Sequence, residues 1–198
     1  MIKNIIFDLG GVVLGRGYHE SGHDMPAFSF LQGDRPFPKY WKDFDLGRIS
    51  QRAVAEAVAT QEECSIEEAD SLVCVLREMF DEFPLTAELI RELSGKGYKI
   101  YVLSNMPAEY YNHMKNMDVF KYVDGTVISS AEGLSKPDPL IFGLLVSRFG
   151  LTPSESLFVD DKLSNTMAAE ALDFRTYHFA DTEKGPDEIR ELLNSNQE

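Results

Sequence analysis

The chain has 198 residues, of which 43% are hydrophobic and 26% are charged, and its mean hydropathy is -0.23. This composition is typical of a globular protein with one core, or one core and a small accessory domain, and it excludes general disorder. The formal net charge of -14 and the pI of about 4.7 argue against nucleic acid or an anionic membrane as a partner. A small phosphorylated substrate is compatible with this charge, because a local cation can dominate a pocket.

The sequence favours a cytoplasmic location. No apolar run approaches the roughly 18 residues that span a bilayer. The N-terminal apolar run is broken by Asp8 and lacks a small-residue cleavage site, unlike a signal peptide. Cys64 and Cys74 lack the spacing of a metal or redox motif. A disulfide is one interpretation; we favour two buried free thiols in a reducing compartment.

The first predicted element is a buried strand, Ile5-Ile6-Phe7, which stops at Asp8 and is followed by Gly10 and Gly11. Two interpretations fit this stretch. One is a plain turn, and the other is an active site whose nucleophile lies at the tip of a central strand.

The segment 15–84 differs from the rest of the chain. Its first part is rich in Gly, Pro and aromatic residues, and two helices are predicted over 49–63 and 65–80, the second with a Ser65/Glu68 capping box. We interpret the segment as a helical lid inserted after the first strand; the alternative is a structural helical pair without a gating role. The aromatic residues are predicted to form the lid's own small core, with a sugar-binding platform as the alternative: Phe28, Phe30, Phe37 and Trp41.

Beyond residue 84 strands and helices alternate regularly. The predicted elements are a helix with Leu85, Leu89 and Leu93 on its core face, a strand over 98–105, a helix opened by Pro107, a strand over 125–130, a helix over 137–150, a strand over 156–161, a helix through 167–172 capped by Ser164 or Asn165, a strand over 175–179 and a helix from Pro186.

This alternation predicts an α/β fold, a Rossmann-like parallel sheet with helices on both faces, plus a small all-helical cap. The core is assigned to 1–14 and 85–198, and the cap to 15–84. Ligands of such sheets bind beyond the carboxyl ends of the strands. Polar residues end three predicted strands on that side: Asp8, Ser104-Asn105 and Asp160-Asp161.

Four motifs occur in order: FDLGGVV (7–13), VLSN (102–105), SKPDP (135–139) and LFVDD (157–161). In this combination the chain resembles the haloacid-dehalogenase-like superfamily, in the branch with a helical cap after the first strand. More narrowly it resembles the FDLG-type sugar-phosphate phosphatases. The resemblance spans nearly the whole chain and is weakest between 15 and 45.

The residues at the strand ends suit phosphoryl transfer. Asp8 is placed to attack phosphorus as a carboxylate nucleophile, giving an aspartyl-phosphate. Asp161 can supply a second carboxylate to a Mg²⁺ site, which prefers hard oxygen ligands; a solvated strand end is the alternative. The resemblance implies that the backbone carbonyl of Gly10 is a third ligand.

Other positions follow from the motifs. Ser104 and Asn105 precede a helix, where they can hydrogen-bond phosphate oxygens or serve as a simple N-cap. The resemblance assigns Lys136 to pair with phosphate and Asp8. Asp160 and Asn165 are expected to orient the metal or Lys136.

Gly10 departs from the resemblance, because most hydrolases of this superfamily carry an acid–base aspartate there. General acid–base catalysis typically contributes roughly 10²–10⁴ in rate. Either the substrate has a good leaving group, or His19, His23 or Asp24 replaces the acid, or the protein binds phosphate with little turnover. A metal role for the two histidines is disfavoured by the glycines around them.

Bases in the lid segment could hold a substrate anion, although scattered surface bases are the simpler explanation: Arg16, Arg35, Lys39 and Lys42. A dehalogenase needs no metal, so the pair Asp160-Asp161 counts against it. We therefore expect a Mg²⁺-dependent phosphatase acting on a small phosphorylated metabolite, a sugar phosphate first. The alternative is a catalytically weak phosphate-binding or regulatory protein. The sequence does not specify the oligomeric state.

Overall fold

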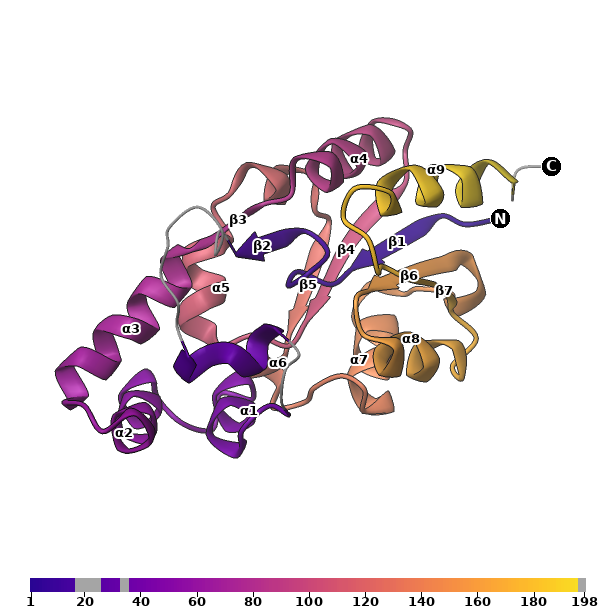
Figure 1. Ribbon diagram of the computed structural model, residues 1–198. Coiled ribbons are helices and arrows are strands. Elements are labelled where there is room, and N and C mark those ends of the chain that lie inside the picture. The colour runs from indigo at the N-terminus through magenta and orange to yellow at the C-terminus, as the bar shows by residue number, and fades with distance from the viewer. Residues whose placement is uncertain (17–25, 33–35, 196–198) are drawn as a thin grey trace.

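The computed structural model describes residues 1–16, 26–32 and 36–195. Five parallel strands form one sheet in the order β5-β4-β1-β6-β7, which confirms the predicted α/β fold (Figure 1). The strands are β1 (Asn4–Phe7), β4 (Lys99–Ser104), β5 (Gly125–Ile128), β6 (Ser156–Asp160) and β7 (Arg175–His178).

Strand β1 is the centre of the sheet and is apolar on both faces. Ile5 and Phe7 belong to one hydrophobic cluster, and Ile6 belongs to the other. Successive side chains of a strand point to opposite faces, so a continuous apolar run is what a strand covered on both sides requires.

Helices cover both faces of the sheet. The cluster of Ile5 and Phe7 includes residues of α4 (Pro84–Gly95), α5 (Ala108–Met114) and α9 (Gly185–Ser195). The cluster of Ile6 includes residues of α7 (Pro139–Phe149) and α8 (Leu163–Glu170). The short helices are α6 (Ser129–Glu132), η2 (Asp118–Tyr122) and η3 (Pro153–Glu155).

Three local predictions were wrong. The strand predicted to reach residue 130 ends at Ile128, because Ser129–Glu132 form α6. Helix α8 has Lys162 at its N-cap with no side-chain cap, so neither Ser164 nor Asn165 caps it. Leu85 lies at the start of α4 and is 39% exposed, so it is not on the core face.

The described residues of the insert form four helices and two short strands. It contains η1 (Pro26–Gln32), α1 (Lys39–Asp45), α2 (Gln51–Glu62) and α3 (Ile66–Glu78), and the predicted Ser65/Glu68 capping box precedes α3. Strands β2 (Leu14–Arg16) and β3 (Phe80–Glu82) pair antiparallel where the insert leaves and re-enters the core. The expectation of an all-helical cap is corrected by this two-stranded ribbon.

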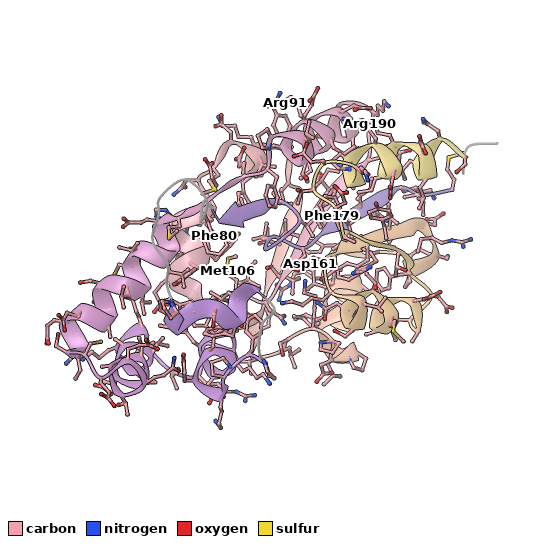
Figure 2. All side chains as sticks on the ribbon, in the orientation of Figure 1. Phe80, Arg91, Met106, Asp161, Phe179 and Arg190 are labelled. Atoms are coloured by element: carbon pink, nitrogen blue, oxygen red, sulfur yellow. The ribbon has the colours of Figure 1, made fainter. Side chains whose placement is uncertain are left out.

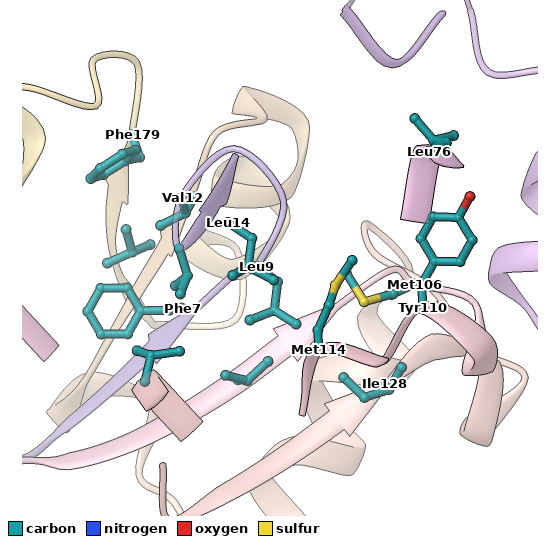
Figure 3. Packing of buried hydrophobic residues seen from close by; sticks show 14 of the residues in the cluster. Phe7, Leu9, Val12, Leu14, Leu76, Met106, Tyr110, Met114, Ile128 and Phe179 are labelled. Atoms are coloured by element: carbon teal, nitrogen blue, oxygen red, sulfur yellow. The ribbon is translucent and has the colours of Figure 1, made fainter. Parts of the chain in front are cut away.

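The aromatic residues of the insert pack as predicted, but they do not form a separate core. Trp41 makes edge contacts with Phe28 and Phe30, and also with Tyr110 of α5 at 5.9 Å between ring centroids. The Tyr110 hydroxyl donates to the Val73 carbonyl of α3 over 3.0 Å. Figure 3 shows the shared cluster running from Phe7 to Tyr110 and Leu76.

Cys64 and Cys74 are free thiols, as predicted, but both are half-buried and not fully buried. Among the residues described, no helix is both long enough and apolar enough to cross a membrane.

The end of α1 is docked on α6 of the core through a close backbone contact. Gly47 has a φ of +66°, and a Cβ atom there would lie 2.4 Å from the Ser130 carbonyl oxygen. Gly133 has nearly the same φ, +67°, but a Cβ atom there would meet nothing within 4 Å. Substituting each glycine in turn therefore distinguishes the cost of backbone strain, which both positions share, from the cost of losing the close contact, which only Gly47 makes.

We expect Gly47→Ala to lower the free energy of unfolding more than Gly133→Ala does. Both variants carry left-handed strain of about 1–3 kcal/mol, but only Gly47→Ala also forces the segment after α1 away from the Ser130 backbone. Urea unfolding of the two variants measures the difference. Equal losses would show that the close contact between Gly47 and Ser130 adds nothing to the stability of the protein.

Candidate active site

The two glycines after β1 have different local roles. Gly11 has a φ of +81°, and a Cβ atom at this position would lie 2.8 Å from Oδ2 of Asp161. Both the conformation and the close approach require glycine. A Cβ atom on Gly10 would meet nothing within 4 Å. The turn is thus built around the approach to Asp161, and Gly10 leaves open space.

Asp8 directly follows β1 and is 6% exposed. Its Oδ1 accepts a hydrogen bond from the Leu9 N–H over 2.7 Å and lies 3.0 Å from Nζ of Lys136. Within the described parts of the chain, no donor reaches Oδ2 of Asp8. One oxygen of this carboxylate is therefore fixed, and the other is available to react.

Three carboxylates meet at the carboxyl ends of β1 and β6. Asp8, Asp160 and Asp161 each offer an oxygen, and these atoms lie within 4.8 Å of one another. Burial, and then the charge of Asp8, raise the pKa of Asp161 to about 6. Its buried Oδ1 has no hydrogen-bond partner among the described residues. Such a group is ready to take up a cation.

Lys136 is the buried cation of the site, with its side chain 1% exposed. Its Nζ lies 3.0 Å from Oδ1 of Asp8 and 2.6 Å from Oδ2 of Asp160. Burial alone would lower the pKa of Lys136, but the charges of Asp8 and Asp160 outweigh burial and raise it. The ammonium group therefore stays charged.

Asp160 is fully buried, and its carboxylate oxygens are occupied. Besides the contact with Lys136, Oδ1 accepts from the Lys162 N–H over 2.8 Å, and Nδ2 of Asn165 donates to both oxygens at 2.9 and 3.0 Å. Asp160 thus contacts both Lys136 and Asn165, and their role in orienting the lysine stays a prediction.

Asn105 holds the backbone of Lys136. Its Oδ1 accepts from the Lys136 N–H over 2.8 Å, and its Nδ2 donates to the Lys136 carbonyl over 2.9 Å. In this arrangement Asn105 clamps the lysine loop, a contact that sequence reasoning missed. Ser104, 1% exposed, lines the same cavity as Asp8.

The donor set fits a magnesium ion. The oxygens of Asp8 and Asp161 are hard ligands, and the orphaned Oδ1 of Asp161 faces no protein donor in the described residues. Gly10 lines the same cavity as Asp8 and Asp161. Asp160 is already satisfied by protein donors, which leaves Asp8 and Asp161 as the carboxylates for a metal.

A cavity of about 640 Å³ lies above these groups, in the size range of pockets for small ligands. Its roof comes from the insert and includes apolar and charged residues: Leu31, Phe37, Trp41, Lys42, Asp45, Leu46 and Phe80. Figure 2 labels Phe80, Met106 and Asp161, which line it from the insert, from the loop after β4 and from the loop after β6.

The roof contains residues that the sequence did not single out. Asp45 lies one helical turn beyond the buried Trp41, a spacing that places both on one face of α1 and could have signalled it. Nζ of Lys162, which follows β6, lies 4.6 Å from the ring centroid of Phe37 in the insert.

The remaining candidates from the sequence are the basic residues of the insert and the possible replacements for the acid at position 10. Lys42 lines the cavity, whereas Lys39 pairs with Asp43. His19, His23, Asp24 and Arg35 lie outside the described residues, as does the side chain of Arg16.

We expect Lys136→Met to lower the free energy of unfolding by about 3–5 kcal/mol, because it leaves the buried carboxylates of Asp8 and Asp160 without their cation. Lys184→Met, at an exposed pair with Asp181, should cause no measurable change. Urea unfolding at neutral pH without added metal checks both. A small loss for Lys136→Met would mean that the lysine does not compensate the two acids.

The chain is similar in sequence to two phosphatases, one over about half of that protein and the other over its full length. A sesquiterpene phosphatase of Aspergillus oryzae is 34% identical over 109 residues, which cover 53% of this chain and 54% of that protein. The D-ribitol-5-phosphate phosphatase of Bacteroides thetaiotaomicron is 28% identical over 98% of this chain and 100% of its own length. The chain thus matches about half of the first relative and the whole of the second.

Solved structures share the fold. A HAD family enzyme of Bacteroides thetaiotaomicron with magnesium and inorganic phosphate bound is 22% identical, with a TM-score of 0.72 over 89% of this chain and 93% of that chain. L-2-haloacid dehalogenase of Xanthobacter autotrophicus is 21% identical, with a TM-score of 0.67 over 89% and 76%. The fold therefore does not choose between phosphatase and dehalogenase chemistry.

The model of one hydrolase family matches residues 2–173, which include all four sequence motifs and every group of the acidic cluster. The chain belongs to the haloacid dehalogenase-like hydrolases.

Proposed function

We propose that this protein is a Mg²⁺-dependent phosphomonoester hydrolase that forms an aspartyl-phosphate at Asp8. The observation that carries the proposal is the pairing of a nucleophile with its cation. Asp8 lies 3.0 Å from the buried ammonium of Lys136, beside a carboxylate that lacks a protein partner, at the base of a small-ligand cavity.

In the first step, Oδ2 of Asp8 attacks phosphorus while Oδ1 stays held by the Leu9 N–H and Lys136. The bond from phosphorus to the ester oxygen breaks, and the leaving oxygen needs a proton. In the second step, water attacks phosphorus, the bond to Asp8 breaks, and inorganic phosphate is released.

In this mechanism, the residues around Asp8 offset the negative charge of the bound phosphate. Lys136 supplies the permanent positive charge for a phosphate dianion, and Asn105 keeps its backbone in place. Ser104 lines the same cavity as Asp8, and we assign its hydroxyl to hydrogen-bond a phosphate oxygen. Asp8, Asp161 and the Gly10 carbonyl would hold Mg²⁺, which when bound neutralises phosphate charge and acts as a template.

The proposed substrate is a small phosphorylated metabolite, with a sugar or polyol phosphate as the first choice. The relative that matches over its full length is named for ribitol 5-phosphate. Phe37 and Trp41 line the roof, so an aromatic platform for such a substrate accompanies their role in packing. An isoprenoid phosphate is the next choice, because the other relative is a sesquiterpene phosphatase.

A second candidate is a phosphate-binding protein with little turnover. Gly10, which places no acid next to the nucleophile, favours this function. The magnesium-dependent rate distinguishes it from the first candidate.

The division of the chain remains part of the proposal: residues 15–84 act as a lid, and 1–14 with 85–198 form the catalytic core. We also propose a cytoplasmic location, with the free Cys64 and Cys74 in support.

We expect Asp8→Asn to abolish hydrolysis of 4-nitrophenyl phosphate, because an amide cannot displace the ester oxygen. The wild type should hydrolyse this ester with Mg²⁺ and lose activity with a chelator. Steady-state rates with and without Mg²⁺ test both points. A wild type without metal-dependent turnover would favour the phosphate-binding alternative, and an active Asp8→Asn would remove Asp8 from its role.

Mg²⁺ should stabilise the folded protein, because the folded chain gathers the carboxylates of Asp8 and Asp161. At a hundred times its Kd, a ligand raises the free energy of unfolding by about 2.7 kcal/mol. Thermal unfolding with and without Mg²⁺ measures this shift. Asp161→Asn should lose most of it, whereas Asp43→Asn, at an exposed ion pair, should retain it. An unchanged shift in Asp161→Asn would place the ion elsewhere.

A further inference from the structure

The proposed reaction lacks an acid for the leaving group, because Gly10 has no side chain. Of the described residues that line the cavity, three carry carboxyl groups: Asp8, Asp161 and Asp45. The first two are assigned to the nucleophile and the metal. Asp45 is the remaining carboxyl, and it approaches from the lid.

The carboxyl group of Asp45 belongs to a buried residue that lines the cavity. The residue is 9% exposed, and no hydrogen bond from a described residue reaches its side chain. Burial raises the pKa of Asp45 well above its ordinary value; Lys162 opposes this rise, and the charge of Asp8 adds to it. The other charged residues of the cavity are Lys42, Lys136 and Asp161.

The core fixes the position of Asp45. The Ser129 hydroxyl donates to the Asp45 carbonyl over 2.5 Å and accepts from the Met106 N–H over 2.9 Å. Gly47, two residues further along, allows close backbone contact with Ser130. The carboxyl is therefore presented to the cavity by a docked segment of the lid.

In-line displacement requires the leaving group to depart on the side of phosphorus opposite the nucleophile. Asp8 lies at the carboxyl end of β1, and α1 contributes to the roof of the same cavity. A leaving oxygen that moves away from Asp8 moves toward the lid, where Asp45 lies.

We propose that Asp45 is the catalytic acid and base that the core lacks at Gly10; this rests on the proposed phosphatase function. As Oδ2 of Asp8 bonds to phosphorus and the ester bond breaks, the proton of Asp45 passes to the leaving alkoxide, which departs as the alcohol. The Asp45 carboxylate then takes a proton from the attacking water. The water oxygen bonds to phosphorus as the bond to Asp8 breaks, and both carboxyl groups are restored.

The leaving group tests this role. An alkoxide needs protonation to depart, whereas 4-nitrophenolate does not. Asp45→Asn should therefore slow the release of ribitol from ribitol 5-phosphate in the first turnover by about 10²–10⁴-fold and change the first-turnover release of 4-nitrophenolate little, because the water step, which is common to both esters, follows that release. Asp43→Asn, on the same helix but paired with Lys39 and Arg48, should leave both rates unchanged.

A second variant supplies the missing acid from the core. Gly10 has space for a side chain, so Gly10→Asp should raise the alkyl ester rate at least tenfold in the Asp45→Asn background and much less in the wild type. Equal acceleration in both backgrounds would overturn the role of Asp45. So would an Asp45→Asn variant that slows the first-turnover release of both leaving groups by the same factor, or that slows neither release.

Failure of this proposal is distinct from failure of the phosphatase function. If Asp8→Asn stops hydrolysis of both esters while Asp45→Asn shows no dependence on the leaving group, only the role of Asp45 is overturned. If Asp8→Asn retains both activities, the aspartyl-phosphate mechanism itself is wrong, and the role of Asp45 falls with it.

Discussion

The site depends on one buried ammonium group between two carboxylates. Lys136 contacts Asp8 and Asp160 at 3.0 and 2.6 Å with almost no exposure to solvent. A buried ion pair is tolerated only where its remaining polar groups are satisfied. Here Asn165 and the Lys162 N–H satisfy Asp160, and Asn105 fixes the lysine backbone. These contacts tie the ends of β1, β4 and β6 to one point, so fold and site are one arrangement.

This balance also explains why the site would need a second cation. Lys136 is shared by Asp8 and Asp160, so its charge is already matched before Asp161 is counted. A phosphate dianion would add two negative charges to a chain with a net charge of -14. Burial and the charge of Asp8 already raise the pKa of Asp161 to about 6. A divalent cation between Asp8 and Asp161 would offset both the excess carboxylate and the incoming substrate.

The gathering of carboxylates at the strand ends could be predicted from the sequence, whereas the place of Asp45 in the roof could not. Apolar strands that end in acids predict where carboxylates gather, because parallel strands present their carboxyl ends at one edge. That logic does not reach Asp45, whose significance depends on how a lid docks. It also cannot separate Gly10 from Gly11, since only the approach to Asp161 shows which glycine is required. The clamp by Asn105 depends on a loop that meets it from 31 residues away.

If the acid–base group is Asp45 in the lid and not an aspartate at position 10, the catalytic groups are all present only when the lid is docked. An aspartate at position 10 would accompany the nucleophile whether or not the lid is docked. Asp45 shares the cavity with Asp8 because Ser129 holds its backbone and Gly47 allows the docking contact with Ser130. The docked lid also contributes Phe37 and Trp41 to the roof. Proton donation and cover from water would then arrive together, so an alkyl ester would be cleaved only when the substrate is enclosed.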